Sequence, residues 1–214
     1  MNKDNNLETY YDHYKETYNL NREFQSYRNR NYVLLCILEG IAFMMIWNPD
    51  LICGILNDTA RNELKTAIQI SNSILQTLNW FFILYILVRY IQNTLYIERG
   101  YLYIDKLEKQ IQLLLNEDGS NTCFNREGEN YLRDYPVVLN LIDLFYNFLS
   151  PLAFTTINSF HIWFEWGHRK NSIAFFCDLL VFIAATILTT LFVIKLFSSS
   201  SKQKQLTPQQ KETI

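Results

Sequence analysis

Three side chains with acid–base or metal-binding chemistry lie close together near the end of the third apolar stretch. His161 and His168 flank Glu165 in the segment HIWFEWGH. Imidazole and carboxylate groups at such spacing can hold a metal ion or exchange protons. Tryptophan and phenylalanine surround them, however, and aromatic rings with short polar groups are typical of a membrane interface. We therefore interpret this segment as interface filling. The chain has no Gly-rich phosphate loop, no HExxH and no nucleophile elbow, so we expect no enzyme, cofactor or metal.

Charged residues inside the apolar stretches are the second candidate for function. Glu39, Arg89 and Asp143 are expected at similar depth, and each would cost about 2.5–3.5 kcal/mol at the centre of a membrane helix. A cluster of the three would offset that cost. It would serve either as a structural group that fixes helix register or as a charged constriction or gate in an ion pathway. Asp178, in the last apolar stretch, is expected to pair with a basic residue of the neighbouring turn or to face outer water.

Uncharged polar residues form a stripe on the second apolar stretch. Asn72, Gln76 and Asn79 are spaced i, i+4, i+7 and so share one helix face, and Asn147 belongs to a similar polar set in the third stretch. In lipid, such residues hydrogen-bond across helices or line water. Either the stripe joins subunits or it lines a pore, and both alternatives predict a homo-oligomer.

The elements that carry these residues are predicted to be membrane helices. The chain has 214 residues, 49% of them hydrophobic, and a net charge of −2 that indicates neither nucleic acid nor an acidic substrate as a partner. Long apolar runs separated by polar segments predict an all-α integral membrane protein with four transmembrane helices in two hairpins and a helical cytosolic insert. The expected divisions are an N-terminal amphipathic helix (1–31), a first hairpin (32–92), the insert (93–136), a second hairpin (137–197) and a disordered tail (198–214).

The stretch 72–115 organises this arrangement. It lacks proline and contains one glycine, Gly100, so it predicts a single helix that crosses the membrane and extends into the cytosol. Breaks are expected at Asn48-Pro49-Asp50, in a polar link at 57–66, and in an aromatic turn at 161–171. The third span is expected over 137–160 and the fourth over 172–197. Lysine and arginine are concentrated in the N-terminal arm, the insert and the tail, which predicts that both termini are cytosolic.

The N-terminal helix and the insert are the expected contact regions. One face of the N-terminal helix carries Leu7, Tyr10, Tyr11, Tyr14 and Tyr18, and we expect it to pack on the protein itself or on lipid headgroups. In the insert, the candidates for contact with a cytosolic ligand or partner are Tyr96, Arg99, Tyr101, Tyr103, Arg126 and Arg133. They would form either a basic-aromatic pocket for a nucleotide or oligonucleotide, or a juxtamembrane cap that contacts lipid phosphate. We favour the cap.

The layout resembles that of the small four-span membrane subunits of bacterial anti-phage defence systems. The features that carry the resemblance are two hairpins, cytosolic termini, and a helical insert with REG, YL and YP in the segment 126–136. The membrane components of the Kiwa and Hailong systems are the examples we have in mind. The resemblance implies an oligomeric, tetrameric protein of the bacterial inner membrane that works with a cytosolic protein partner.

Two functions follow from these expectations. The first is an oligomeric, channel-like membrane effector of anti-phage defence, gated through its cytosolic insert. The second is a non-conducting membrane sensor or scaffold that recruits a cytosolic effector protein through residues 93–136.

Overall fold

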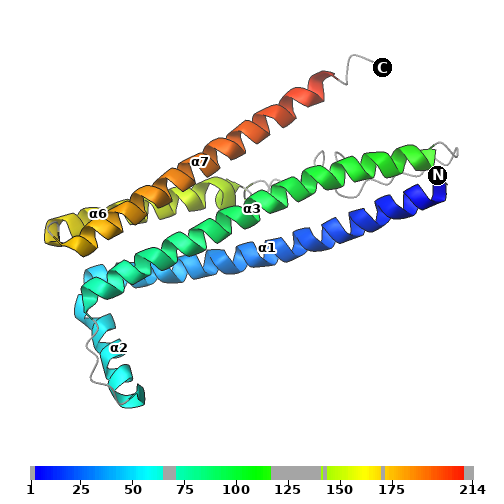
Figure 1. The fold of residues 1–214 in the computed structure, drawn as a ribbon. Helices are drawn as coiled ribbons and strands as arrows, with labels where there is room; N and C mark the ends of the chain where they lie inside the picture. Colours follow the sequence, from blue (N-terminus) through cyan, green and yellow to red (C-terminus); the bar gives the residue numbers. More distant parts are fainter. Residues whose placement is uncertain (1–2, 65–70, 117–140, 142–143, 170–171, 210–214) are drawn as a thin grey trace. The chain divides into compact units, whose positions relative to one another are not determined.

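The chain is helical throughout the part that the structure describes. In the computed structural model, α1 (Lys3–Trp47) is followed by α2 (Pro49–Leu64), α3 (Asn72–Asn116), the π-helical turn η1 (Phe145–Leu149), α6 (Ser150–Arg169) and α7 (Ile173–Gln209) (Figure 1). The structure describes all residues except 1–2, 65–70, 117–140, 142–143, 170–171 and 210–214. The described residues include no strand, so the predicted all-helical class is confirmed.

The ends of the helices follow from local chemistry. Pro49 cannot continue α1 because it lacks an N–H, and it opens α2 instead, at the first helical position. The break expected at Asn48-Pro49-Asp50 is therefore confirmed. Ser71 caps α3, because its Oγ accepts a hydrogen bond from the N–H of Ile74 at 3.4 Å. From there α3 continues to Asn116, which confirms the single long helix expected over 72–115.

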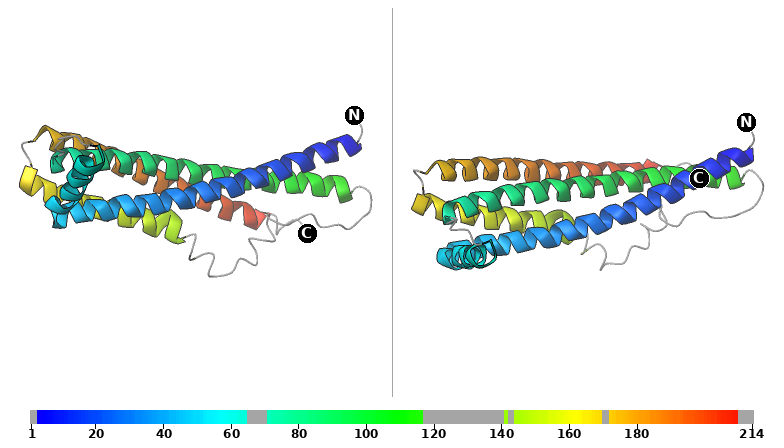
Figure 2. Two further views of the ribbon diagram at one scale, coloured as in Figure 1. Left: turned by 90° about the horizontal axis from the view of Figure 1, so that it is seen from below. Right: turned by 60° about the horizontal axis from the view of Figure 1, so that its bottom comes forward.

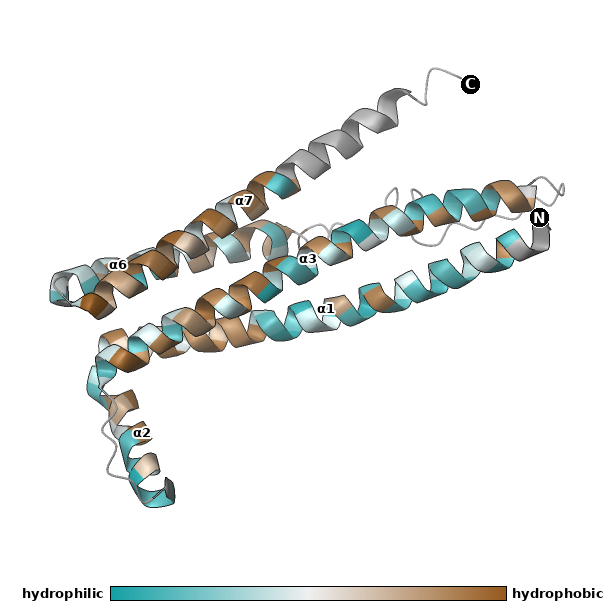
Figure 3. Cartoon of the chain, in the orientation of Figure 1, coloured by the Kyte–Doolittle hydropathy of each residue, from teal (hydrophilic) through white to brown (hydrophobic). Residues whose placement is uncertain are grey.

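The chain divides into two compact units, and α1 and α3 contribute to both. Unit 1 comprises Met1–Tyr32 and Arg89–Ile142, and unit 2 comprises Val33–Val88 and Asp143–Ile214. Colouring by hydropathy shows that α1 and α3 are apolar in their unit 2 segments and more polar in their unit 1 segments (Figure 3). The same two helices therefore carry two different kinds of surface.

Unit 1 is an antiparallel pair made by the first part of α1 and the last part of α3. Its apolar core consists of Tyr14, Ile104, Leu107 and Ile111, against which Leu7, Tyr10, Tyr18 and Leu115 pack. The predicted packing face of the N-terminal helix is thus confirmed for Leu7, Tyr10, Tyr14 and Tyr18. Tyr11, also expected there, is half exposed.

Buried polar residues continue this core along unit 1. They are Asn21, Asn31, Asn93, Thr94 and Glu108. The closest approach of the two helices involves Gly100: a Cβ on this residue would lie 1.9 Å from the Oδ1 of Asn21. Because no side chain fits at that distance, glycine is required at position 100 for Asn21 to occupy its buried place.

Unit 2 combines the last part of α1, α2, the first part of α3, η1, α6 and α7. The helices α6 and α7 run side by side, as Figures 1 and 2 show. Buried positions recur every three or four residues, for example at Leu35, Glu39 and Ala42 on α1. This spacing is that of helices packed nearly parallel to one another, with one face of each turned inward.

Three stretches of the described residues are long and apolar enough to cross a membrane. They are Asn6–Trp47, Asn72–Leu115 and Ile173–Leu196, which indicates a multi-pass membrane protein. The span predicted over 137–160 is not among them. Part of it lies outside the described residues, and the rest forms η1 and the start of α6. The polar side chains of α6, among them Asn158, His161 and Glu165, lower its hydropathy, and the two-hairpin layout stays a prediction.

Several predicted breaks are helical instead. The aromatic turn expected at 161–171 is wrong for 161–169, which belong to α6, because the inward face of that helix continues through His161 and Glu165. The polar link expected at 57–66 is helical as far as Leu64. Similarly, α7 continues to Gln209, so residues 198–209 of the predicted disordered tail are helical. In each case a helix that starts in an apolar segment propagates into polar residues that contain no early proline.

Candidate functional site

A buried pair of ionisable residues on α6 is the centre of the candidate site. His161 and Glu165 are each 1% exposed. They are four residues apart, so they lie one above the other on the inward face of the helix. The Nε2 atom of His161 is 3.2 Å from the Oε1 atom of Glu165. The expected position of both residues beside His168, as filling of the outer interface, is wrong, because the pair is buried in the interior.

His168 does not join the pair. It is exposed, its Nδ1 is 2.9 Å from the backbone oxygen of Phe164, and its ring stacks on the Phe164 ring at 4.3 Å. Within the described part of the chain, no group of three or more His, Cys, Asp and Glu side chains is placed to hold a metal ion.

Two residues of α3 contact the pair. The indole Nε1–H of Trp80 donates to Oε1 of Glu165 at 3.0 Å. The same indole stacks on the His161 ring, with 5.0 Å between centroids and 13° between planes. The amide Nε2 of Gln76 is 3.5 Å from His161 Nε2. Trp80 is 0% exposed, so one fully enclosed side chain holds both the imidazole and the carboxylate in place.

A third helix brings another acid to this region. Asp178 is on α7 and is 0% exposed. It is four residues from Phe182, whose ring packs edge-on against Trp80 at 6.2 Å. Asp178 therefore lies on the face of α7 that is turned toward Trp80. The expectation that Asp178 faces outer water is wrong.

Glu39 on α1 has a partner on α6. The Nδ2 atom of Asn158 donates to Oε1 of Glu39 at 2.6 Å, a short bond as expected for a charge-assisted hydrogen bond. Asn158 is three residues from His161, so the inward face of α6 carries Asn158, His161 and Glu165 at spacings of three and four. This spacing is the signal in the sequence that could have identified the site.

The predicted cluster of Glu39, Arg89 and Asp143 does not describe the contacts found. Glu39 bonds to Asn158, whereas Nη1 of Arg89 donates to Oε1 of Gln92 at 3.2 Å on an exposed surface. Asp143 lies outside the described residues. The partner of Glu39 Oε1 is thus a neutral amide from the adjacent helix and not a basic side chain.

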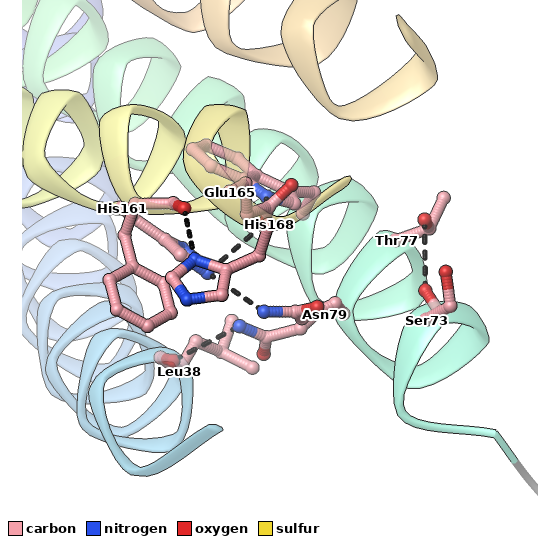
Figure 4. A network of polar contacts seen from close by, with 10 residues as sticks. Leu38, Ser73, Thr77, Asn79, His161, Glu165 and His168 are labelled. Atoms are coloured by element: carbon pink, nitrogen blue, oxygen red, sulfur yellow. Dashed lines mark hydrogen bonds and ion pairs between the residues drawn. The ribbon is translucent and has the colours of Figure 1, made fainter. Parts of the chain in front are cut away.

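The polar stripe of α3 points into the protomer. Asn79 is buried, and its Nδ2 donates to the backbone oxygen of Leu38 on α1 at 3.2 Å (Figure 4). Gln76 contacts His161, as described above. Asn72, half-buried, accepts a weak hydrogen bond from the thiol of Cys53 at 3.8 Å. The stripe thus contacts α1, α2 and α6 of the same chain.

Most hydroxyl groups of the apolar helices bond to their own backbone. Thr155 and Thr156, for example, donate to the carbonyl oxygens of Pro151 and Leu152 at 2.8 and 2.9 Å. Such a hydroxyl can face lipid without an unmet hydrogen bond. These residues therefore do not support the homo-oligomer, which stays a prediction. Asn147, another candidate, is half-buried in the π-helical turn η1.

The tyrosines and arginines of the predicted insert are divided between two faces of α3 in unit 1. Tyr96, Arg99 and Tyr103 are exposed and spaced i, i+3, i+7, so they share an outer face. Tyr96 also stacks on Phe24 of α1 at 5.1 Å. Tyr101 instead turns toward α1, where its hydroxyl accepts a hydrogen bond from Gln25 at 2.8 Å. Arg126 and Arg133 lie outside the described residues.

The fold and the site define a class rather than a family. Comparison of the chain with protein-family models, curated proteins and solved structures finds no match. The class is that of all-helical proteins with several helices able to cross a membrane. In unit 2, four side chains that can carry a charge are buried: Glu39, His161, Glu165 and Asp178.

Proposed function

We propose that the protein is a channel-like membrane effector whose ion pathway follows the buried polar residues of unit 2. The observation that carries this proposal is the set Glu39, His161, Glu165 and Asp178, of which none is more than 4% exposed. Ionisable groups are costly inside a membrane, and where they occur they generally mark ion pathways or proton relays. The layout resemblance to anti-phage defence subunits suggests that the pathway opens during infection, through a cytosolic partner.

Exposed side chains of unit 2 support the placement of Glu39 inside an apolar layer. The outward face of α7 is apolar, with Leu180, Ile187 and Leu191 largely exposed. Trp47 at the end of α1 and Trp163 on α6 are 82% and 71% exposed. Exposed tryptophans beside apolar faces are typical of the boundary between lipid and water. Glu39, eight residues before Trp47, would then lie about 12 Å below that boundary, well inside the apolar layer.

Gating through unit 1 is the second part of the proposal. α1 and α3 are each continuous from unit 1 into unit 2. A partner or ligand that changes the pairing of α1 and α3 in unit 1 therefore acts on helices that also carry Glu39, Gln76 and Trp80. The close approach of Asn21 to Gly100 makes this pairing sensitive to small changes.

Ion flux into liposomes that contain the purified protein tests the pathway. We expect Gly100→Ala, which forces Asn21 out of its place, to increase flux over the unsubstituted protein. Gly40→Ala is the matched control, because nothing lies within 4 Å of a Cβ at that position. The double variant Gln76→Leu and Asn79→Leu should abolish the increase. Flux that is unaffected by this double variant would exclude the α3 stripe from the pathway.

The alternative function, a membrane sensor or scaffold that recruits a cytosolic protein, has its own supporting observation. The exposed face of Tyr96, Arg99 and Tyr103 combines rings with a positive charge, and aromatic and arginine side chains are enriched where proteins bind. Affinity capture from infected cells, with the protein and a Tyr103→Ala, Arg99→Glu variant, tests it. Loss of one captured partner in the variant, together with no flux from any form of the protein, would favour the scaffold.

A further inference from the structure

We infer that the ion transferred in unit 2 is the proton and that the His161–Glu165 pair carries it. This inference rests on the proposed function and specifies its substrate. Three observations lead to it: the direct contact of the two side chains, the contact of Glu165 and Gln76 with one nitrogen atom of His161, and the enclosure of the pair by Trp80.

The Nε2 atom of His161 has two partners that require opposite protonation states. The Glu165 carboxylate, 3.2 Å away, accepts a hydrogen bond from Nε2–H. The amide nitrogen of Gln76, 3.5 Å away, donates to an Nε2 lone pair. A proton on Nε2 thus selects Glu165, and its departure selects Gln76. His161 Nε2 therefore has a defined hydrogen-bond partner both before and after it transfers one proton.

The transfer itself is a balanced acid–base step. In the starting state His161 is an imidazolium and Glu165 is a carboxylate. The Nε2–H bond of His161 breaks, an O–H bond forms at Oε1 of Glu165, and the freed lone pair of His161 accepts the amide N–H of Gln76. Trp80 donates to Oε1 of Glu165 and stacks on His161, so it positions both groups without titrating. Its ring also stabilises the imidazolium by a cation–π interaction.

The remaining titratable groups around the pair are acids on the other helices. α7 contributes Asp178 and α1 contributes Glu39, whereas α3 presents Gln76 and Trp80, which do not titrate. Asn158 lies one turn below His161 on α6 and bonds to Glu39 at 2.6 Å. The inward face of α6 therefore carries Glu165, His161 and Asn158 in order, and Asn158 connects this face to Glu39 on α1.

The packing favours a proton over a larger ion. A metal cation must exchange its hydration shell for several ligands, and the described residues provide no group of three His, Cys, Asp or Glu side chains placed to hold one. The ring of Trp80 is in stacking contact with His161 and is fully buried. A proton can pass between groups that are already in hydrogen-bond contact, so it requires no cavity at this point.

The first test measures which ion moves. Liposomes with the full-length protein or with its Gly100→Ala variant are loaded with a pH-sensitive dye, and parallel samples contain dyes for potassium and for chloride. We expect proton flux, and we expect His161→Gln and Glu165→Gln each to reduce it to the level of protein-free liposomes. Both substitutions keep a polar side chain of similar size. His168→Gln on the same helix is the control and should leave the flux unchanged.

The second test measures proton uptake at the pair without reference to transport. In a variant with Trp47, Trp163 and Trp166 replaced by phenylalanine, Trp80 is the one remaining tryptophan. A protonated imidazole quenches an indole stacked on it, so Trp80 emission should fall as the pH is lowered through the range of about 8 to 5 in which histidine titrates. His161→Gln should remove this pH dependence, and His168→Gln should retain it.

The outcomes separate the inference from the proposed function. Flux of potassium or chloride that survives His161→Gln would overturn the proton inference and leave a channel. Trp80 emission that does not change with pH would overturn it as well. The absence of flux of every ion, from both the protein and the Gly100→Ala variant, would overturn the channel and the proton inference together.

Discussion

The two units use the same two helices for different purposes. In unit 1, the buried polar residues of α1 and α3 are mostly amides and hydroxyls, such as Asn21, Asn93 and Thr94. In unit 2, the corresponding inward faces carry Glu39 on α1 and contact His161 and Glu165 on α6. Amides in a helical seam specify register and orientation. Ionisable groups in the same kind of position can also exchange charge.

The outer surfaces of the two units also differ, but on the surface it is unit 1 that carries the charged residues. Unit 2 exposes large apolar side chains along α3 and α7, for example Phe82 and Leu180. Unit 1 exposes charged residues on α3, including Lys109, whose Nζ is paired with Asp105 at 3.0 Å. Unit 2 therefore has an apolar exterior and an ionisable interior, whereas unit 1 has a charged exterior. We therefore expect functional chemistry in the interior of unit 2 and not on its surface.

The largest loss of stability is expected when a charge is removed from the interior of unit 2. Glu165→Ala leaves the indole N–H of Trp80 and the imidazole of His161 without their acceptor, so we expect a loss of about 3–5 kcal/mol in the free energy of unfolding. Glu165→Gln keeps an acceptor for Trp80 and should cost less. Thermal unfolding in detergent, followed by circular dichroism, measures both. Equal losses in the two variants would mean that the negative charge of Glu165, which both variants lack, determines the effect, and not an acceptor for Trp80.

A smaller effect is expected from unit 1. In Gly100→Ala the new methyl group collides with Asn21, and such overpacking costs about 1–3 kcal/mol. Gly40→Ala meets no neighbour and gains up to about 1 kcal/mol of helix propensity. Because the gain in helix propensity applies to both positions and the collision only to Gly100, Gly100→Ala should have the lower melting temperature of the two variants. If Gly100→Ala is as stable as Gly40→Ala, the helices of unit 1 do not approach each other closely in solution.

Removing an amide from unit 2 should cost less again. Asn158→Ala deletes the hydrogen bond to Glu39, and hydrogen bonds between membrane helices contribute about 0.6 kcal/mol on average, with a maximum of about 1.7 kcal/mol. We expect the upper value, because the acceptor is a carboxylate and the bond is short. Ser159→Ala, one residue along and exposed, is the matched control in the same melting experiment. A loss no larger than that of the control would place Glu39 outside this contact.

Most of the helical fold could be predicted from sequence, and most of the site could not. Periodicity and composition predict α3 as one helix and the packing face around Tyr14, because both depend on local patterns. The partner of Glu39 depends on which helix is adjacent, and the sequence offers Arg89 and Asp143 as more obvious choices than Asn158. The aromatic residues around His161 and Glu165 predict an interfacial turn. The spacings of three and four residues between Asn158, His161 and Glu165 instead indicate one face of a single helix, which is what the structure shows.

The smallest effect is expected where the polar residue faces outward. Thr156 is exposed on α6, and its hydroxyl donates to the carbonyl oxygen of Leu152 in the same helix at 2.9 Å. Thr156→Val keeps the shape of the side chain and removes a bond that holds no other helix, so its effect on unfolding should remain within about 0.5 kcal/mol. Proton flux should also be unchanged. A large loss of stability, measured in detergent and in liposomes, would indicate that this face of α6 is covered by another protein chain, and the predicted homo-oligomer would then have a defined surface.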